Sequence, residues 1–358
     1  MLKKAFVLAL ALFLASGSYL PQAIAQTTNK DALAEAAAGL KLRGIGPALM
    51  AGRIADIAVS TADPSTWYVA VGSGGLWKTT NRGTSWQAMG LPASEHIGKI
   101  LVDPRNSHVA YVAAEGPLWS AGGDRGLYKT TNDGKTWQLV LPIDENTGVT
   151  DVEFDPSNPD VLYAAAYQRR RHVWSLLAGG PKSGIYKSSD GGASWHRMAT
   201  GLPKGDMGKI GLAVTPANPQ LVYATIEAAD NEKGFYRSTD KGESWEKRNS
   251  YISGGTGPHY YQEIEASPVN ADLVYQMDVF LHVTRDGGKT FDYLGTGREK
   301  HSDNHALWID PADGEHLLAG CDAGLYETYD EGTTWRHFPN MPVSQFYKLS
   351  LDNAEPFY

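Results

Sequence analysis

Apolar and polar residues alternate over short stretches along most of the chain, and many stretches are joined in pairs by turn-forming residues. In the clearest pair, which starts at Gly126, Leu-Tyr-Lys-Thr alternates apolar with polar side chains, Asn-Asp-Gly follows, and Trp137 ends the motif. Such alternation is typical of a half-buried strand, and Asn or Asp followed two residues later by Gly favours a tight turn. The pattern therefore predicts a β-hairpin.

This hairpin pattern occurs six times. Its core is Ser or Thr, then Asp or Asn two residues later, Gly after two more, and finally Ser or Thr followed by Trp or Phe. The copies end at Trp86, Trp137, Trp195, Trp245, Phe291 and Trp335. The copies thus recur about every 50 residues, and a regular period of that length predicts a solenoid or a propeller. The turn-locking side chains are expected to be Asn81, Asn132, Asp190, Asp240, Asp286 and Asp330. Six copies favour a structural role, because one catalytic centre does not need six.

A second repeated pattern precedes each hairpin, in which an apolar strand ends in a turn that usually contains Pro. GKILVDPRNS from Gly98 and GVTDVEFDPSNP from Gly148 are two copies, and another apolar strand follows each. One repeat is therefore strand A, Pro turn, strand B, loop, strand C, Asp turn and strand D. Four antiparallel strands per repeat predict an all-β fold, a β-propeller of four-stranded blades.

Residues 42–344 are expected to form six complete blades. The stretch QFYKLSL within residues 345–358 repeats the strand A pattern and predicts the first strand of a seventh blade. A propeller closes its ring, because an open ring leaves sheet edges and an apolar flank in water. Either Lys41–Leu49 closes a six-bladed ring, or the chain is the front part of a longer protein. We expect the second, a truncated seven-bladed ring.

Residues 1–25 have the features of a secretory signal peptide. Lys3 and Lys4 precede an apolar run at Ala5–Ala15, and Ala-Ile-Ala ends at Ala25, the predicted cleavage site. The apolar run is too short to span a bilayer comfortably, so membrane insertion is not expected. Residues 26–41 form a polar lead segment. The mature chain is therefore predicted to be secreted or periplasmic.

Composition narrows the possible functions. The formal net charge is −8 at pH 7, which disfavours nucleic acid and anionic membranes as partners. Cys321 is the only cysteine, so the chain has no internal disulfide, and its thiol is expected to be buried. Hydrophobic residues make up 42% of the chain, which is enough for a packed core. No cofactor is predicted.

The hairpins resemble the Asp-boxes, or BNR repeats, of sialidases, sortilin-type receptors and xyloglucanase-like glycosidases. Residues 43–59, 168–192 and 301–335 are similar to large secreted bacterial proteins described as BNR-repeat glycosyl hydrolases or sortilin N-terminal-domain proteins. The resemblance covers roughly residues 42–358, and members of that group usually continue further. It implies a propeller fold without implying one activity, because Asp-boxes occur in enzymes and receptors alike.

Strand order indicates where a functional site should lie. In a four-stranded blade the A–B and C–D turns share one face, and the B–C and D–A loops share the other. The short, repetitive Pro and Asp turns occupy the first face. Varied loops on a rigid scaffold usually carry binding sites, so we expect the site on the second face.

The B–C loop of the third blade is the first candidate binding element. It contains Arg169, Arg170, Arg171, His172 and Trp174. Arginines beside a tryptophan are suited to a carboxylate or phosphate and to stacking on a sugar ring or a peptide. The alternative is a solvated loop whose arginines pair with neighbouring carboxylates. A second candidate is the aromatic start of the fifth strand A, His259, Tyr260 and Tyr261; packing between blades is its alternative role.

A weak metal candidate opens the sixth strand A. Alternation would place His301, Asp303 and His305 on one face of an extended chain, suited to a divalent metal. A hydrogen-bonded cap at the start of the strand is the alternative, and no metal site is predicted as the main expectation.

Catalytic carboxylates are less well defined. The weak candidates in the B–C loops are Glu115, Asp124 and Asp322. Glycoside hydrolysis needs two carboxyl groups at a suitable separation. In xyloglucanase-like enzymes one catalytic Asp lies before Gly-Gly in the first blade and its partner lies in a second propeller. Here Gly72 starts that stretch and no carboxylate is present.

Two functions therefore remain open. One is a scaffold that binds a polysaccharide or a peptide. The other is a glycoside hydrolase of the xyloglucanase-like kind, which either acts through carboxylates not yet identified or needs a second propeller from the C-terminal half of a longer chain.

Overall fold

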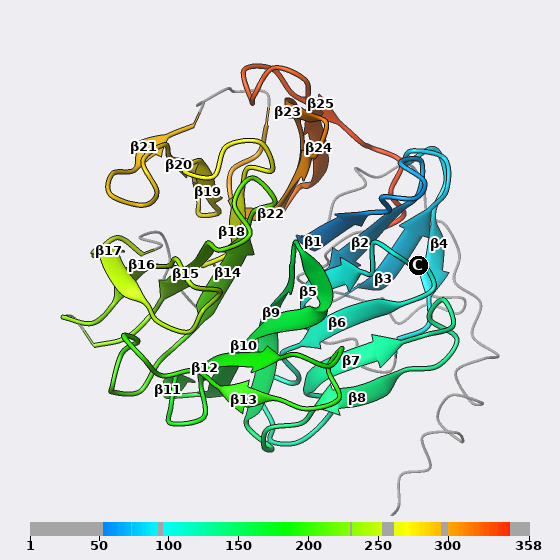
Figure 1. The fold of residues 1–358 in the computed structure, drawn as a ribbon. Helices are drawn as coiled ribbons and strands as arrows, with labels where there is room; N and C mark the ends of the chain where they lie inside the picture. The colour runs from blue at the N-terminus through cyan, green and yellow to red at the C-terminus, as the bar shows by residue number, and fades with distance from the viewer. Residues whose placement is uncertain are drawn as a thin grey trace, which may run out of the picture. The chain divides into compact units, whose positions relative to one another are not determined.

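The computed structural model describes residues 53–343, except 73, 92–95, 230, 253–260 and 295–299. All of these residues lie within one compact unit, Leu49–Tyr358. Regular structure in this described part of the chain consists of β-strands, with no α-helix (Figure 1). The predicted signal peptide, the lead segment and the strand expected within residues 345–358 lie outside the described residues.

The first three blades are antiparallel sheets that follow the predicted A–B–C–D order. Blade 1 contains β1 (Ile54–Val59), β2 (Trp67–Val71), β3 (Gly75–Thr79) and β4 (Gln87–Met89). Blade 2 contains β5 (Ile97–Val102), β6 (Ala110–Ala114), β7 (Gly126–Thr130) and β8 (Gln138–Leu141). Blade 3 contains β9 (Thr147–Asp155), β10 (Asn158–His172), β12 (Gly184–Ser188) and β13 (His196–Arg197), and an additional strand β11 (Ser175–Ala178).

The last three blades have the same order. Blade 4 contains β14 (Ile210–Val214), β15 (Val222–Ile226), β16 (Gly234–Ser238) and β17 (Glu246–Asn249). Blade 5 contains β18 (Ile264–Ala266), β19 (Val274–Gln276), β20 (His282–Thr284) and β21 (Asp292–Tyr293). Blade 6 contains β22 (Asn304–Asp310), β23 (Asp313–Cys321), β24 (Gly324–Thr328) and β25 (Arg336–His337).

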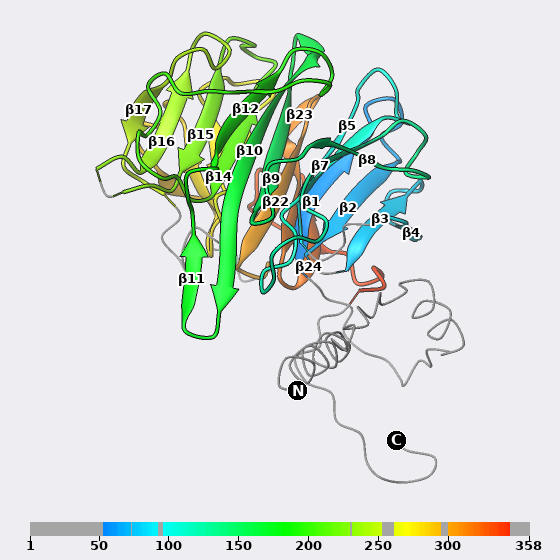
Figure 2. The same ribbon diagram turned by 90° about the horizontal axis from the view of Figure 1, so that it is seen from below.

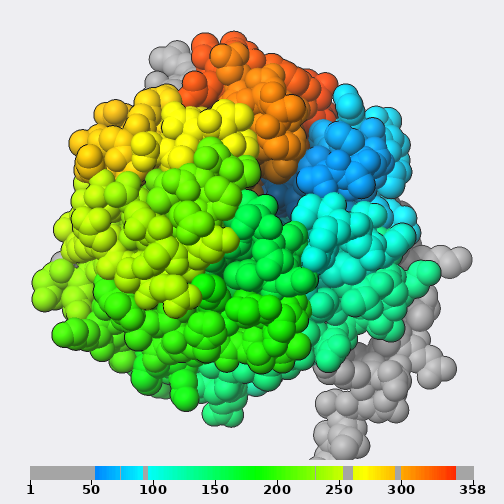
Figure 3. Space-filling view, in the orientation of Figure 1, coloured from blue at the N-terminus to red at the C-terminus, as the bar shows by residue number. Residues whose placement is uncertain are grey.

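The six blades close into a ring. Strand A of blade 1, β1, packs against β5 of blade 2 on one side and β22 of blade 6 on the other. Ile54 and Val69 of blade 1 share a buried apolar cluster with Ala306 and Leu318 of blade 6. In the space-filling view the ring is hollowed at its centre (Figure 3). The propeller fold is therefore confirmed.

The expectation of an unfinished seven-bladed ring was wrong for the described residues. Blades 1 and 6 are direct neighbours, so no gap for a seventh blade remains between them. The apolar flank of blade 6, which an incomplete ring would expose, is covered by blade 1. The closing contacts come from β1, β2 and the chain after β25, and the sequence pattern does not show how strongly a blade curves toward its neighbours.

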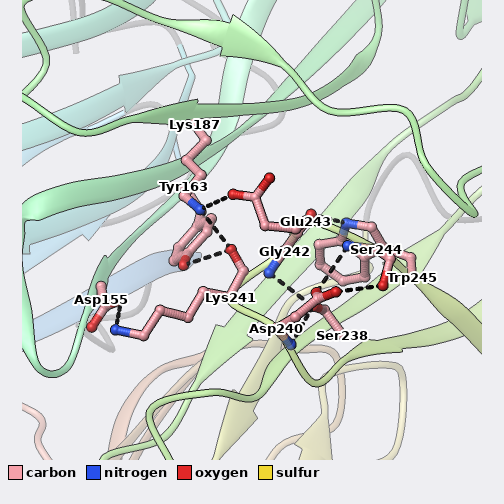
Figure 4. A network of polar contacts seen from close by, with 10 residues as sticks. All are labelled: Asp155, Tyr163, Lys187, Ser238, Asp240, Lys241, Gly242, Glu243, Ser244 and Trp245. Carbon is pink, nitrogen blue, oxygen red and sulfur yellow. Dashed lines mark hydrogen bonds and ion pairs between the residues drawn. The ribbon is translucent and has the colours of Figure 1, made fainter.

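The repeated Asp or Asn locks each C–D hairpin, as the pattern predicted. In blade 4, Ser238 Oγ donates to Asp240 Oδ1 at 2.7 Å, and the backbone N–H of Ser244 donates to the same oxygen at 2.8 Å (Figure 4). The N–H of Gly242 donates to Ser238 Oγ at 2.8 Å. Equivalent bonds form around Asn81, Asn132, Asp190, Asp286 and Asp330.

The A–B turns and the C–D turns lie on the same face of the ring. In every blade the residue after the Asp or Asn donates its N–H to a carbonyl of the A–B turn, as Arg82 does to Ser65 at 3.0 Å and Lys241 does to Gln220 at 3.0 Å. We call this the turn face, and the opposite side, with the B–C and D–A loops, the loop face. The predicted division of the two faces is confirmed.

A recurring polar contact joins one blade to the next, and we call it the interblade clamp. In blade 3 the hydroxyl of Tyr163 donates to the carbonyl of Lys241 in the blade 4 turn at 3.0 Å (Figure 4). Lys187 Nζ donates to the same carbonyl at 2.9 Å and to Glu243 at 2.6 Å. In return, Lys241 Nζ reaches Asp155 at 2.7 Å. The matching tyrosines bond to the turn face of the following blade: Tyr68, Tyr111, Tyr223 and Tyr275.

The joint between blades 6 and 1 is built differently. Leu318 and Glu327 occupy the strand positions that Tyr163 and Lys187 occupy in blade 3. Here the chain after β25 closes the joint. Asn340 Nδ2 donates to the carbonyl of Gly83 at 2.6 Å, and the ring of Phe338 meets that of Trp67 edge-on at 5.7 Å.

The inner strands carry a cluster of buried charges around the ring axis. Lys99 Nζ of blade 2 lies 3.8 Å from Asp56 of blade 1, 3.1 Å from Glu153 of blade 3 and 3.2 Å from Glu265 of blade 5. Asp151 is buried nearby and accepts the N–H of Leu212 at 2.6 Å. We call these five side chains the axial cluster. Its single cation faces four carboxyl groups.

Burial and mutual repulsion keep protons on this cluster. Burial raises the pKa of Asp56 to about 7, although Lys99 and the N–H of Ile100 act in the opposite direction. Burial raises the pKa of Asp151 to about 6 and that of Glu153 well above its usual value. Desolvation disfavours the charged form of a carboxyl group, so one lysine does not hold all four carboxyl groups ionised.

A turn-lock prediction concerns Asp240. Its replacement by Ala removes the acceptor for Ser238 and Ser244, so the free energy of unfolding should fall by about 1 kcal/mol or more. Asp240→Asn should retain most of the stability, because Asn81 and Asn132 make the same bonds in blades 1 and 2. Urea unfolding of the three proteins measures the difference. Equal losses for Ala and Asn would contradict the proposed geometry.

A pH prediction concerns Asp56. Because the pKa of this group rises from 3.8 to about 7 on folding, the folded protein retains a proton that the unfolded chain releases between those values. The stabilisation is complete below pH 3.8 and is lost as the pH rises toward 7. Relative to Asp56→Asn, the wild type should lose up to about 1.4 kcal/mol per pH unit across this window. Unfolding curves at several pH values measure it, and a constant difference between the two proteins would refute the shift.

Candidate functional site

A pocket opens at the axis where strands A begin and strands B end, on the loop face. Its space amounts to about 610 Å³, including the part open to solvent. All six blades contribute to its polar lining: Arg53, His96, Glu115, Tyr167, Arg169, Lys209, Glu263 and His305. Apolar lining comes from Ile97, Leu118 and Leu176.

A buried ion pair forms one wall of this pocket. Arg169 Nη1 lies 2.6 Å from Glu115 Oε2, and both side chains are almost fully buried. Thr150 Oγ1 donates to the other carboxylate oxygen at 2.9 Å. Burial acts to raise the pKa of Glu115, but Arg169 and Lys209 outweigh it and hold that pKa at about 2. Glu115, a weak catalytic candidate, is therefore ionised at any ordinary pH.

A second ion pair forms the opposite wall. Lys209 Nζ lies 2.5 Å from Glu263 Oε1, and the backbone N–H of Lys209 donates to Glu227 Oε2 at 3.1 Å. Burial raises the pKa of Glu227. The hydroxyl of Tyr167 is fully buried and has no hydrogen-bond partner in the structure as described. An unsatisfied buried hydroxyl beside a pocket indicates a place for a water or a ligand group.

The two histidines of the pocket have different surroundings. Burial lowers the pKa of His96 to about 4, so its ring is neutral at pH 7. His305 Nε2 contacts Asp322 Oδ1 at 3.0 Å, and the ring of Tyr261 stacks on His305 at 5.1 Å. Burial acts to raise the pKa of Asp322, but His305 outweighs it and lowers that pKa. Asp322 is therefore ionised and oriented by a histidine.

The metal candidate does not assemble as the alternation suggested. Asp303 has a φ of 64° and β22 begins only at Asn304, so the chain is not extended from His301 to His305. Asp303 accepts a bond from Tyr261 at 2.7 Å, whereas His305 pairs with Asp322. In the described part of the chain no group of three or more His, Cys, Asp or Glu side chains is placed to hold a metal ion.

The predicted blade 3 loop is an ordered hairpin. β10 continues past its partners in the blade, and its residues 169–172 pair with β11. Figure 2 shows that this hairpin projects beyond the other blades. Val173 and Trp174 form its two-residue tip and are 90% and 82% exposed. The rings of His172 and Trp174 stack at 5.5 Å.

The three arginines of this hairpin have different surroundings. Arg169 is buried in the ion pair with Glu115, as the alternative interpretation expected. Arg170 Nη1 donates to Asn146 Oδ1 at 3.1 Å. The guanidinium of Arg171 lies over the ring of Trp119, 5.8 Å from its centre. The hairpin thus brings one arginine to the pocket wall and another to an aromatic surface.

Trp119 is a surface feature that sequence reasoning missed. It lies in the blade 2 B–C loop, between the weak candidates Glu115 and Asp124, and it is 60% exposed. The signal was present in the sequence as a tryptophan within a glycine-rich loop, but only the carboxylates of that loop were considered. Asp124 is half-buried in the same loop and does not line the pocket.

The remaining predicted residues have simple outcomes. His259 and Tyr260 lie outside the described residues, and Tyr261 is buried against His305. Burial raises the pKa of the Cys321 thiol to about 11, so this cysteine is the inert buried thiol that was expected. Gly72 lines the pocket and offers no carboxylate. Within the described residues, no helix has the length and apolar character needed to cross a membrane.

Comparisons with known proteins give partial matches. A family model described as "Sortilin, neurotensin receptor 3" matches residues 74–233. The chain is 23% identical over 366 residues to a xyloglucanase from a Paenibacillus species, covering 82% of this chain and 34% of the relative. It is 30% identical over 151 residues to a probable oligoxyloglucan-reducing end-specific xyloglucanase from Neosartorya fischeri, covering 40% of this chain and 16% of the relative.

Two solved structures match the fold over about 80% of this chain. The xyloglucanase from Xanthomonas campestris has a TM-score of 0.55 at 16% identity, over 80% of this chain and 55% of that one. An ancestral GH74 enzyme has a TM-score of 0.54 at 22% identity, over 82% of this chain and 39% of that one. The chain spans about a third or less of the curated relatives. These findings agree with the resemblance: the chain is a β-propeller, and it is similar to xyloglucanases and, over residues 74–233, to the sortilin family model.

Proposed function

We propose that this chain is an exported recognition scaffold that binds a neutral polysaccharide across its loop face. The observation that carries the proposal is the axial pocket flanked by exposed tryptophans. Its charges are largely paired within the wall, as Arg169 with Glu115 and Lys209 with Glu263. Such a wall offers both donors and acceptors with little net charge, which suits sugar hydroxyl groups.

Exposed aromatic side chains favour the same face. Trp119 and Trp174 come from the B–C loops of blades 2 and 3, and Phe280 from that of blade 5, where it is 51% exposed. On the turn face, Tyr329 is exposed in the C–D turn of blade 6. Aromatic rings present a flat apolar surface with little conformational entropy to lose, which suits the faces of sugar rings.

The relatives support a glycan ligand. Those named above act, by their names, on xyloglucan or its oligosaccharides. Because the chain spans about a third or less of the curated relatives, their activity is a proposal for this protein. Export is supported by the signal-peptide pattern at residues 1–25. A peptide ligand, which the sortilin match brings into consideration, is the outcome to be tested against.

Hydrolysis is the second candidate function. Glycoside hydrolysis needs one ionised and one protonated carboxyl group. Burial raises the pKa of Glu227, whereas the pKa of Glu115 is held at about 2. Both carboxyl groups act to raise the pKa of the buried Tyr167. Groups whose environments drive their pKa values apart are candidates for acid and base roles.

A binding prediction tests the proposed function. Trp174→Ala should weaken binding of xyloglucan oligosaccharides about 3- to 10-fold, the usual range for losing one aromatic stacking contact. Because Trp174 is at a hairpin tip, thermal stability should hardly change. Isothermal titration calorimetry measures the affinity. Tyr329→Ala, an aromatic of similar exposure on the turn face, is the matched control and should bind normally.

The outcomes separate the ligand classes. Unchanged binding by Trp174→Ala, or equal losses in both variants, would place the ligand elsewhere. Binding of extended peptides with no binding of oligosaccharides would refute the glycan ligand.

A hydrolysis prediction tests the second candidate. If the chain cleaves xyloglucan, Glu227→Gln should abolish most of the release of reducing ends, because an amide does not ionise and cannot act as a general acid. Glu246→Gln is the control, since Glu246 is an exposed residue of β17. Absence of reducing-end release by the wild type would leave recognition without catalysis.

A further inference from the structure

The B–C loop of blade 2, Glu115–Arg125, is an irregular surface segment held by several hydrogen bonds, and we call it the Trp119 loop. It has no strand hydrogen bonding of its own between β6 and β7. Even so, it presents a tryptophan that is 60% exposed, with the guanidinium of Arg171 over the ring. Loops of this kind are normally mobile, so the contacts that hold this one require an explanation.

One buried arginine organises the whole loop. Arg125 Nε donates to the carbonyl of Gly122 at 2.8 Å, and Nη1 donates to that of Glu115 at 2.8 Å. Nη2 donates to the carbonyls of Ser120, at 2.7 Å, and Pro117. Arg125 is only 5% exposed. A single side chain therefore bonds four carbonyls distributed on both sides of Trp119.

The packing within the loop leaves no room for a side chain at two glycines. A Cβ on Gly116 would lie 2.2 Å from Arg125 Cγ, and this glycine has a φ of 74°. A Cβ on Gly123 would lie 2.6 Å from Pro117 Cγ. Both glycines are thus required by close contacts within the loop.

The blade 3 hairpin holds the loop from the other side. The N–H of Arg171 donates to the carbonyl of Leu118 at 2.8 Å, directly before Trp119. Arg169 Nη2 donates to the carbonyl of Gly116 at 3.1 Å. The N–H of Gly122 donates to the carbonyl of Glu145 at 2.7 Å. Both the pocket wall and the aromatic surface therefore depend on the same loop conformation.

We propose that Trp119, lying against Arg171, is a preformed stacking platform for a pyranose ring, and that Arg125 is the positioning residue that holds it rigid before the ligand arrives. The inference rests on the proposed function and specifies one of its contacts. Surface carbonyls would otherwise bond to water, so stability alone does not require a buried guanidinium here. Rigidity matters for binding, because a preordered aromatic loses less conformational freedom when the ligand stacks on it.

The indole ring of the platform suits the face of a sugar ring. The guanidinium of Arg171 lies over the ring and keeps its charge, whereas the adjoining Arg169 is neutralised by Glu115. An indole ring offers an apolar face and a single N–H donor at its edge. That combination fits the C–H face and the ring-edge hydroxyl groups of a pyranose.

The test uses the full chain with a xyloglucan oligosaccharide and two readouts, calorimetric affinity and hydrogen–deuterium exchange of residues 115–125. Arg125→Met and Trp119→Ala should each weaken binding about 3- to 10-fold, and the double variant should be no weaker than Trp119→Ala alone. Arg125→Met should also accelerate exchange in the loop. Arg125→Lys, which keeps the charge but does not bond four carbonyls, should behave like Arg125→Met and serves if the latter fails to fold.

Arg105→Met is the matched control, because Arg105 lies in the A–B turn of the same blade and is half-exposed. It should change neither readout. Faster hydrogen exchange in the loop with unchanged affinity would overturn the positioning role of Arg125. Unchanged exchange in both Arg125 variants would show that Arg125 does not hold the loop rigid. Normal binding by Trp119→Ala would overturn only the platform, whereas no binding by the wild type would overturn the proposed function together with it.

Discussion

The propeller depends on the Asp turn, which has two roles in the structure. The Asp or Asn side chain locks a hairpin within its own blade. In four joints the same turn then accepts the hydroxyl of a buried tyrosine from the blade before, through a backbone carbonyl for Tyr111 and Tyr163 and through a side-chain carboxylate for Tyr68 and Tyr275. Tyr163 and Lys187 both bond the carbonyl of Lys241, next to Asp240. If the turn were loosened, the ends of its own two strands would shift. The hydrogen-bond acceptor for the preceding blade would shift with them. Local turn chemistry in this way sets the spacing between blades, which is otherwise a long-range property of the ring.

This arrangement restricts where recognition takes place. On the turn face, side chains and carbonyls are already bonded between consecutive blades, so a ligand there would compete with the contacts that hold the ring. In the described residues, the loop face has no contact of this kind that recurs from blade to blade. Its loops differ from blade to blade, and they supply the axial pocket, the projecting β10–β11 hairpin and the exposed Trp119 and Trp174. The repeated half of each blade stabilises the ring, and the irregular half remains available for binding.

The fold was predictable from sequence because its signals are local and repeated. The turns around Asp190 and Asp240 were identified with their hydrogen-bonding role, and strand order then assigned the two faces correctly. Ring closure was not predictable, since it depends on contacts between Ile54 and Leu318, far apart in the chain. Alternation failed at Asp303, where a positive φ interrupts the strand. The candidate site was predicted only in part. The sequence pointed to the hairpin with Trp174 but not to Trp119, because the role proposed for Trp119 depends on Arg125 and Arg171 folding around its loop.

Electrostatics along the axis connects the fold to the choice of ligand. Asp56, Lys99 and Glu265 lie one or two residues beyond the pocket-lining Ala55, Gly98 and Glu263 on the same inner strands. Four carboxyl groups around one lysine would leave net negative charge beneath the pocket if all were ionised. Burial keeps part of that charge protonated, with the pKa of Asp56 at about 7. The pocket lining contributes Arg53, Arg169 and Lys209 against Glu115 and Glu263, and this excess of one cation offsets part of the negative charge that remains on the inner strands. The two layers together therefore carry little net charge, which fits the neutral glycan proposed as the ligand.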